Sequence, residues 1–177
     1  MKKIISLLLV VTILLTGCSL MNEEKTPTDA VEAYLDSYKN LDDNVLDDLK
    51  DLVEDMTSYT SDQKERYHEL MKEHYGDMSY EVKSETIDGD SATVEVEIEV
   101  RDYSQVMGTE PDMEEYKNED GTYDEEKYYN SQLDMLESTT DKIKYTIVLT
   151  LTKEEDGWKV EEPNEIVKQK IHGIYTY

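Results

Sequence analysis

The sequence predicts an α+β fold, in which helices from the first half of the chain pack on an antiparallel sheet of about four strands. Two features of the hydrophobic pattern predict it. Apolar residues recur at helical spacing between positions 26 and 76, and from position 80 onward the period changes to two. Glutamates alternate with the apolar residues of the clearest strand, so one face of the sheet must meet water, as is common in antiparallel sheets.

Three helices are expected before the sheet. The first begins at Thr26, an N-cap residue followed by Pro27 at the first helical position and by Asp29 as the acidic member of a capping box. The third begins with a similar signal at Thr60 and ends at Gly76, which we expect as a left-handed residue just after the helix. Apolar residues spaced by three or four define the buried faces of the three helices: Val31, Tyr34, Leu35 and Tyr38; Val45, Leu49, Leu52 and Val53; Tyr67, Leu70, Met71 and Tyr75.

Two hairpins form the predicted sheet. Turns rich in aspartate and glycine connect the two strands of each hairpin. The strands are expected at 80–87, 92–100, 143–151 and 158–160. The clearest of them turns one apolar series toward the core: Ala92, Val94, Val96, Ile98 and Val100.

A helical insertion is expected between the hairpins. The segment 111–141 is too long for a bare loop in a compact domain, and a helix from Asp124 to Glu137 fits its apolar spacing. After the second hairpin, a short helix from Asn164 to His172 completes the chain and ends at Gly173.

The first residues have the order of an export signal. Two lysines are followed by an uncharged run from Ile4 to Leu15 and then by small residues. A membrane-crossing helix needs about 20 apolar residues, so this shorter run predicts a signal peptide, residues 1–17, that is removed.

The end of this run, Leu15-Thr16-Gly17-Cys18, resembles the bacterial lipobox, in which a diacylglycerol is attached to the cysteine before cleavage. Cys18 is the only cysteine of the chain, so no disulfide can form within it. The formal net charge is −25, and such a chain is repelled by nucleic acid and by anionic membranes. We therefore expect covalent lipid to hold the protein at the outer face of the cell membrane. Residues 18–25 would form the lipidated tether and 26–177 a single domain.

A wider resemblance covers about Pro27 to Pro163. The helix PTDAVEAYLDSYKNLD, the two hairpins and the ending LTKEEDGWKVEEP, all behind a lipobox, are similar to Gram-positive lipoproteins of the nuclear transport factor 2-like superfamily, also called cystatin-like. The resemblance implies a curved antiparallel sheet with helices on its concave side, forming a cone that often binds a ligand. Segment 111–141 departs from this pattern as an insertion.

Motifs for common chemistries are missing from the sequence. His68 and His74 are six residues apart, whereas a zinc helix needs a spacing of four, so we expect a surface or boundary pair. His172 is isolated near the C-terminus and no nucleophile motif such as GxSxG occurs, and the acidic loop around Gly121 lacks the ligand spacing of an EF-hand. We therefore predict no metal, no cofactor and no catalytic residue.

The remaining prediction is a non-catalytic module that binds a small molecule or a surface protein. If it has a pocket, the expected place is the cone, where rings of Tyr34, Tyr38, Tyr145 and Trp158 are candidates, although core packing explains each of them equally well. Trp158 is expected to pack on the core. Two alternatives stay open: a small enzyme with an Asp or Glu base and a Tyr donor, of the ketosteroid isomerase type, and an acidic surface spacer without a specific ligand.

Overall fold

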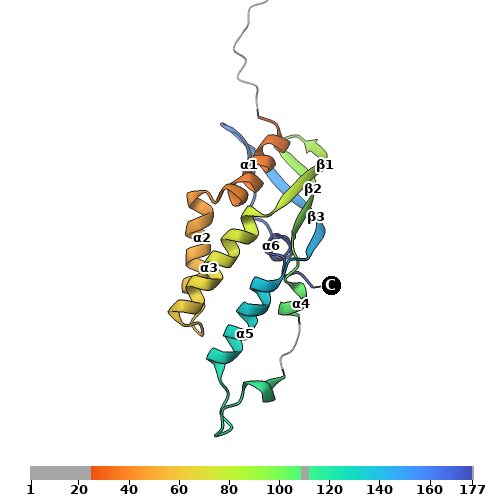
Figure 1. Ribbon diagram of the computed structural model, residues 1–177. Helices are drawn as coiled ribbons and strands as arrows, with labels where there is room; N and C mark the ends of the chain where they lie inside the picture. Colours follow the sequence, from red (N-terminus) through yellow and green to blue (C-terminus); the bar gives the residue numbers. More distant parts are fainter. Residues whose placement is uncertain (1–24, 109–111, 177) are drawn as a thin grey trace, which may run out of the picture.

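The computed structural model describes residues 25–108 and 112–176, and it has the predicted α+β fold (Figure 1). The predicted signal peptide, Cys18 and the tether up to residue 24 lie outside these residues. The helical elements are α1 (Pro27–Asn40), α2 (Asp43–Glu54), α3 (Ser61–Gly76), α4 (Ser104–Met107), the 3₁₀ turn η1 (Met113–Tyr116), α5 (Glu125–Ser138) and α6 (Glu165–Ile171). The strands are β1 (Ser79–Asp88), β2 (Ser91–Arg101), β3 (Lys142–Glu154) and β4 (Gly157–Val160).

Two of the first three helices begin with the predicted capping boxes. The Thr26 hydroxyl accepts a hydrogen bond from the Asp29 backbone N–H at 3.1 Å, and the Asp29 carboxylate accepts one from the Thr26 N–H at 2.7 Å. Thr60 and Gln63 form the same reciprocal pair at the start of α3. The capping signals in the sequence therefore located both helix starts.

The predicted role of Gly76 was wrong. It is the last residue of α3, and the cap is Asp77 in the right-handed conformation. Only two residues separate α3 from β1, and the chain makes this connection without a left-handed turn. The left-handed cap occurs instead at Leu41, which ends α1 with a φ of 56°.

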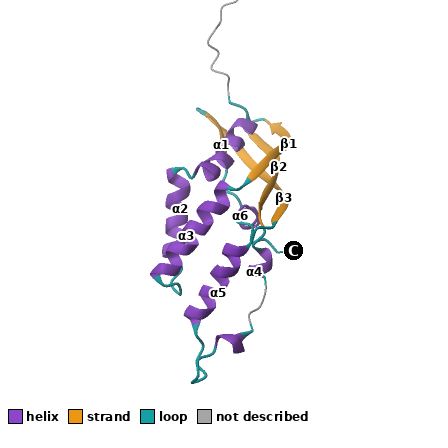
Figure 2. Ribbon diagram, in the orientation of Figure 1, coloured by secondary structure: helices purple, strands orange, loops and turns teal. Residues whose placement is uncertain are grey.

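The sheet is a four-stranded antiparallel meander in the order β1-β2-β3-β4 (Figure 2). The predicted inward series of β2 is 0–3% exposed, and the glutamates between these residues face outward. On the same face, Val96 pairs with Ile147 of β3 and Ile98 pairs with Tyr145. The alternating pattern thus predicted the buried face of the sheet correctly.

Two apolar clusters stabilise the fold. In the first, Val31 and Leu35 of α1 pack on the inward residues of β2 and β3, which closes the sheet's inner face. In the second, Val45 and Leu49 of α2 pack with α3 and with Leu136 of α5, beyond the sheet. The helical half of the molecule therefore has a core of its own, and α2, α3 and α5 extend away from the sheet in Figure 1.

The insertion between β2 and β3 is helical, as predicted. Its main helix, α5, begins after Asp124, whose side chain accepts a hydrogen bond from the Lys127 N–H at 2.9 Å. Arg66 of α3 reaches across to α5 and forms ion pairs with Asp134 and Glu137 at 2.6 and 2.8 Å. The short elements α4 and η1 precede α5 and were not predicted. Each helix in the described part of the chain is too short or too polar to span a membrane.

The C-terminal helix α6 is fixed by contacts at its end. His74 of α3 donates its Nε2 hydrogen to the Ile171 carbonyl at 2.9 Å, and the Tyr103 N–H donates to the Gly173 carbonyl at 2.8 Å. His74 is 0% exposed and its ring stacks on Tyr103, so the expectation of a surface or boundary histidine was wrong for this residue. His74 is buried by tertiary packing, because residues about a hundred positions later in the chain cover this face of α3.

Candidate ligand-binding pocket

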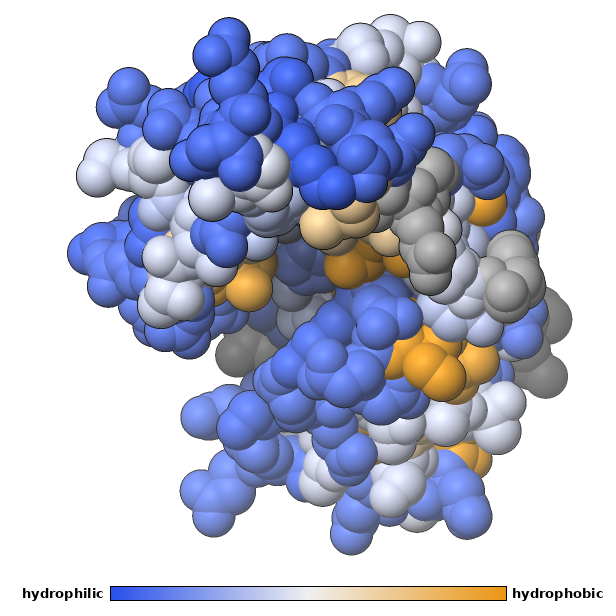
Figure 3. Space-filling model, turned by 90° about the horizontal axis from the view of Figure 1, so that it is seen from below, coloured by the Kyte–Doolittle hydropathy of each residue, from blue (hydrophilic) through white to orange (hydrophobic). Residues whose placement is uncertain are grey.

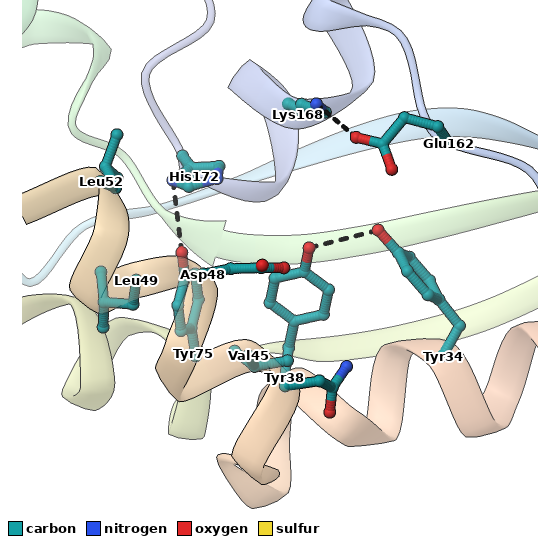
Figure 4. A pocket seen from close by; sticks show the side chains of 11 residues that line it. Tyr34, Tyr38, Val45, Asp48, Leu49, Leu52, Tyr75, Glu162, Lys168 and His172 are labelled. Carbon is teal, nitrogen blue, oxygen red and sulfur yellow. Dashed lines mark hydrogen bonds and ion pairs between the residues drawn. The ribbon is translucent and has the colours of Figure 1, made fainter. Parts of the chain in front are cut away.

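A cavity of about 370 Å³ lies where α1, α2, the end of α3 and α6 meet (Figure 4). Tyr34 and Tyr38 are one helical turn apart on α1 and therefore point to the same side. Tyr75 comes from the last turn of α3, and Lys168 and His172 come from α6 and its end. The contacts that hold the end of α6 against α3 thus also place one wall of the cavity.

The three tyrosine rings form a continuous row along the cavity. The ring centroids of Tyr34 and Tyr38 are 5.5 Å apart and those of Tyr38 and Tyr75 are 5.1 Å apart, both in edge-to-face arrangement. The Tyr34 and Tyr38 hydroxyl oxygens are 3.2 Å apart, and the Tyr75 hydroxyl is 3.4 Å from Nδ1 of His172. Burial raises the pKa of each tyrosine above its ordinary value, so all three hydroxyls stay protonated at neutral pH.

His172 is uncharged at neutral pH. Burial lowers its pKa to about 4, and the positive charge of Lys168 acts in the same direction. The ring therefore offers one nitrogen as a donor and the other as an acceptor. It contributes hydrogen bonds to the cavity and no charge.

The charged groups of the cavity lie on opposite walls. The Lys168 ammonium is 2.5 Å from the Glu162 carboxylate and 3.7 Å from the Glu165 carboxylate. Hydrogen bonding to Glu162 raises the pKa of Lys168, which keeps its charge. Asp48 projects from α2, and within the described residues its carboxylate forms neither an ion pair nor a hydrogen bond. In Figure 4 this carboxylate points toward the Tyr38 hydroxyl.

An apolar patch on α2 completes the lining. Val45 and Leu49 belong to the second core cluster and border the cavity while almost fully buried, and Leu52 is 40% exposed at its edge. The cavity combines aromatic rings, aliphatic side chains and a few placed polar groups, which is the usual composition of a small-molecule site.

The arrangement offers hydrogen bonds and ring contacts rather than a recognisable reaction centre. Within the described residues, no carboxylate is hydrogen-bonded to a tyrosine of this cavity, and no group of three potential metal ligands is found. A tyrosine–carboxylate pair does exist elsewhere, where the Tyr80 hydroxyl donates to Asp36 at 2.8 Å between β1 and α1. That pair does not line the cavity.

The structure separates the four aromatic residues that the sequence suggested for a pocket. Tyr34 and Tyr38 line the cavity. Tyr145 is 1% exposed in the sheet's core, and its hydroxyl donates to the Tyr175 carbonyl at 3.0 Å. Trp158 is half-buried on β4 and packs against the first core cluster, with the Lys153 ammonium 5.8 Å from its ring centroid.

The different locations have a physical cause. Val31 and Leu35 of α1 fill the inner face of the sheet, so the cavity lies beside α1 and below α6 rather than between α1 and the sheet. Tyr75, His172 and Asp48 were not foreseen as pocket residues. In the sequence, Tyr75 looks like one of many core residues of a helix, and His172 follows a helix that is distant in sequence. No local pattern therefore indicates that either residue lines a pocket.

Comparison with known proteins returned no relatives. No protein-family model, no curated protein and no solved structure matches the chain. The resemblance to nuclear transport factor 2-like lipoproteins therefore stays a prediction of the sequence.

Proposed function

We propose that this protein is an extracytoplasmic lipoprotein, held at the outer face of the cell membrane by lipid on Cys18, which binds a small molecule without transforming it. The ligand occupies the cavity between α1, α2, α3 and α6. The fold belongs, in this proposal, to the nuclear transport factor 2-like lipoproteins that the sequence resembles.

The observation that carries the binding role is the cavity itself. Its volume of about 370 Å³ falls in the range of about 300–1,000 Å³ typical of small-molecule sites. Three rings packed against one another and a neutral histidine line it, and they come from elements held by the second core cluster and by the His74 hydrogen bond. Such a site needs little rearrangement to bind, which reduces the entropic cost of association.

The polarity of one face of the molecule favours a small ligand over a protein partner on that face. Figure 3 shows the face at the end of the molecule where α5 and η1 lie: it is mostly hydrophilic, and apolar residues appear only in separate patches around a hollow. A stable protein interface usually buries a continuous apolar centre. The protein-partner form of the binding role is therefore the less favoured one on this face.

Native mass spectrometry tests the binding role. The full chain is purified from the membranes of its own host in a mild detergent, and we expect a non-covalent small-molecule adduct. Leu52→Trp places a larger side chain at the edge of the cavity and should abolish the adduct. Val148→Trp is the matched control, because Val148 is 50% exposed on β3 and does not line the cavity. Absence of any adduct, or equal loss in both variants, contradicts the proposal.

A further inference from the structure

The charged groups around the cavity leave an excess of negative charge. This excess limits which kinds of ligand the cavity can bind. Lys168 is already paired with Glu162 and Glu165, so no free positive charge remains for an anion. His172 is neutral. The Asp48 carboxylate is left without a partner among the described residues, and its charge adds to the effect of burial in raising the pKa of all three pocket tyrosines. The cavity is therefore electronegative.

The hydroxyl groups of the cavity offer more acceptors than donors. Each tyrosine hydroxyl has one hydrogen and two lone pairs. At 3.2 Å one hydrogen is used between Tyr34 and Tyr38, and the pair keeps several free lone pairs. Asp48 adds two oxygens that only accept. A ligand that satisfies this wall must bring N–H or O–H donors, and an ammonium group brings three.

The rings and the aliphatic patch fit the rest of such a ligand. The faces of tyrosine rings attract cations, and Tyr34, Tyr38 and Tyr75 stand together beside Asp48. Leu52 provides an apolar surface for a short hydrocarbon chain, with the nearly buried Val45 and Leu49 beside it. A bare metal ion would gain nothing from this apolar surface, and no group of three metal ligands occurs among the described residues.

We infer that the ligand of this cavity is a small organic cation, a protonated aliphatic amine whose ammonium group contacts Asp48 and the tyrosine hydroxyls while its hydrocarbon part lies on α2. The inference rests on the proposed binding function and specifies its ligand. The net charge of −25 assists it from a distance, since a field of one sign raises the local concentration of cations.

Saturation-transfer NMR with simple probes tests the inference. The full chain in a nonionic detergent is mixed separately with n-butylammonium, n-butanoate and 1-butanol at equal concentration and at about 0.15 M salt. The three probes share a chain length and differ in charge. We expect saturable binding of n-butylammonium, and weaker or no binding of the anion and the alcohol.

Two isosteric variants assign the contact. Asp48→Asn removes the carboxylate charge in the cavity and should weaken n-butylammonium binding about tenfold, as expected for the loss of a charged hydrogen bond. Asp47→Asn removes the same charge from the neighbouring position on α2; both carboxylates are exposed, but only Asp48 lines the cavity, so Asp47→Asn should change binding less than about twofold because a more distant charge is screened by salt. Neither substitution removes a buried group, so both variants should fold.

The outcomes separate this inference from the proposed function. Equal or stronger binding of n-butanoate or 1-butanol overturns the cationic ligand and leaves a binding cavity in place. Equal weakening by both variants assigns the effect to general charge and also overturns it. If none of the three probes binds, the cationic ligand is rejected, and the native mass measurement decides separately whether the cavity binds any other molecule.

Discussion

At Gly173 the C-terminal end of the chain packs closely against α3 and β2. Its φ is +70°, and a β-carbon added there would come within 2.1 Å of the Arg101 carbonyl oxygen and 2.9 Å of the His74 ring. Glycine is required by backbone conformation and by space at the same time. The position of His172 in the cavity therefore depends on the residue that follows it.

Substituting Gly173 tests this dependence. Gly173→Ala should lower the free energy of unfolding by more than about 3 kcal/mol, because left-handed strain of about 1–2 kcal/mol adds to a backbone clash. Gly89→Ala is the matched control, since Gly89 has a φ of +63° and nothing within 4 Å of an added β-carbon. Gly89→Ala should lower the free energy of unfolding only by the cost of the left-handed strain. Equal losses in denaturant titrations of the two variants would show that the close packing at Gly173 is unimportant.

Two histidines with lowered pKa values, the buried His74 and the half-buried His172, predict a loss of stability in mild acid. Burial lowers the pKa of His74 and of His172 to about 4, whereas an unfolded histidine takes up its proton near pH 6.5. Between these values the unfolded state binds more protons, so the stabilisation present above about pH 6.5 is lost as the pH falls toward 4.

The size of this effect can be measured by difference. Each buried histidine should contribute up to about 1.4 kcal/mol per pH unit to the slope of unfolding free energy against pH. His172→Gln should remove one such contribution. The control is His68→Gln, because the His68 side chain is 29% exposed on α3. A slope that His172→Gln leaves unchanged would contradict the lowered pKa of this residue.

At the level of elements, Gln63 links two helices with one side chain. Its Oε1 accepts the Thr60 N–H at 2.9 Å, while its Nε2 donates to the Glu126 carbonyl at 3.0 Å and to Asn130 at 3.1 Å. The residue is 1% exposed. It therefore caps α3 and fastens α5 to it.

Two substitutions separate these roles. Gln63→Glu keeps an acceptor for the cap but sets a carboxylate against two acceptors of α5, and it should cost about 2–3 kcal/mol. Thr60→Ala removes the capping hydroxyl alone and should cost about 1 kcal/mol. Chemical denaturation measures both. A smaller cost for Gln63→Glu than for Thr60→Ala would show that the link to α5 contributes little.

The elements that sequence patterns predicted are those with long periodic runs or explicit caps. The α3 capping box and the alternation in β2 are local signals, and local physics places them correctly. The helix α4 has only four residues, too few to show the periodic spacing of apolar residues that predicts a helix. Gly76 was assigned wrongly because a glycine by itself does not show whether the backbone adopts the left-handed conformation there. Helix spacing brought Tyr34 and Tyr38 to one face, but Tyr75 and His172 meet them only through tertiary packing.

At the level of the whole molecule, the net charge bears on the lipid anchor that we propose. With a net charge of −25, the chain gains no electrostatic attraction to an anionic membrane. Each acyl methylene buried in a membrane contributes about 0.8 kcal/mol, so the two or three chains of a lipidated cysteine suffice for stable attachment.

Cell fractionation tests the anchor. In the native host, the wild-type chain should sediment with membranes and carry lipid mass on Cys18. Cys18→Ala should abolish the lipid and the stable attachment. Wild-type protein found free in the medium, without lipid at its N-terminus, would refute the anchor and leave the binding cavity to be judged on its own.

The most direct test of the central claim is a crystal structure of the protein purified from its own host without added ligands. The claim is that the cavity between α1, α2, α3 and α6 is a binding site. We predict electron density for a bound small molecule against the rings of Tyr34, Tyr38 and Tyr75, with a donor group facing Asp48. A cavity that holds only water, or that is closed by movement of α6 onto α2, would contradict it.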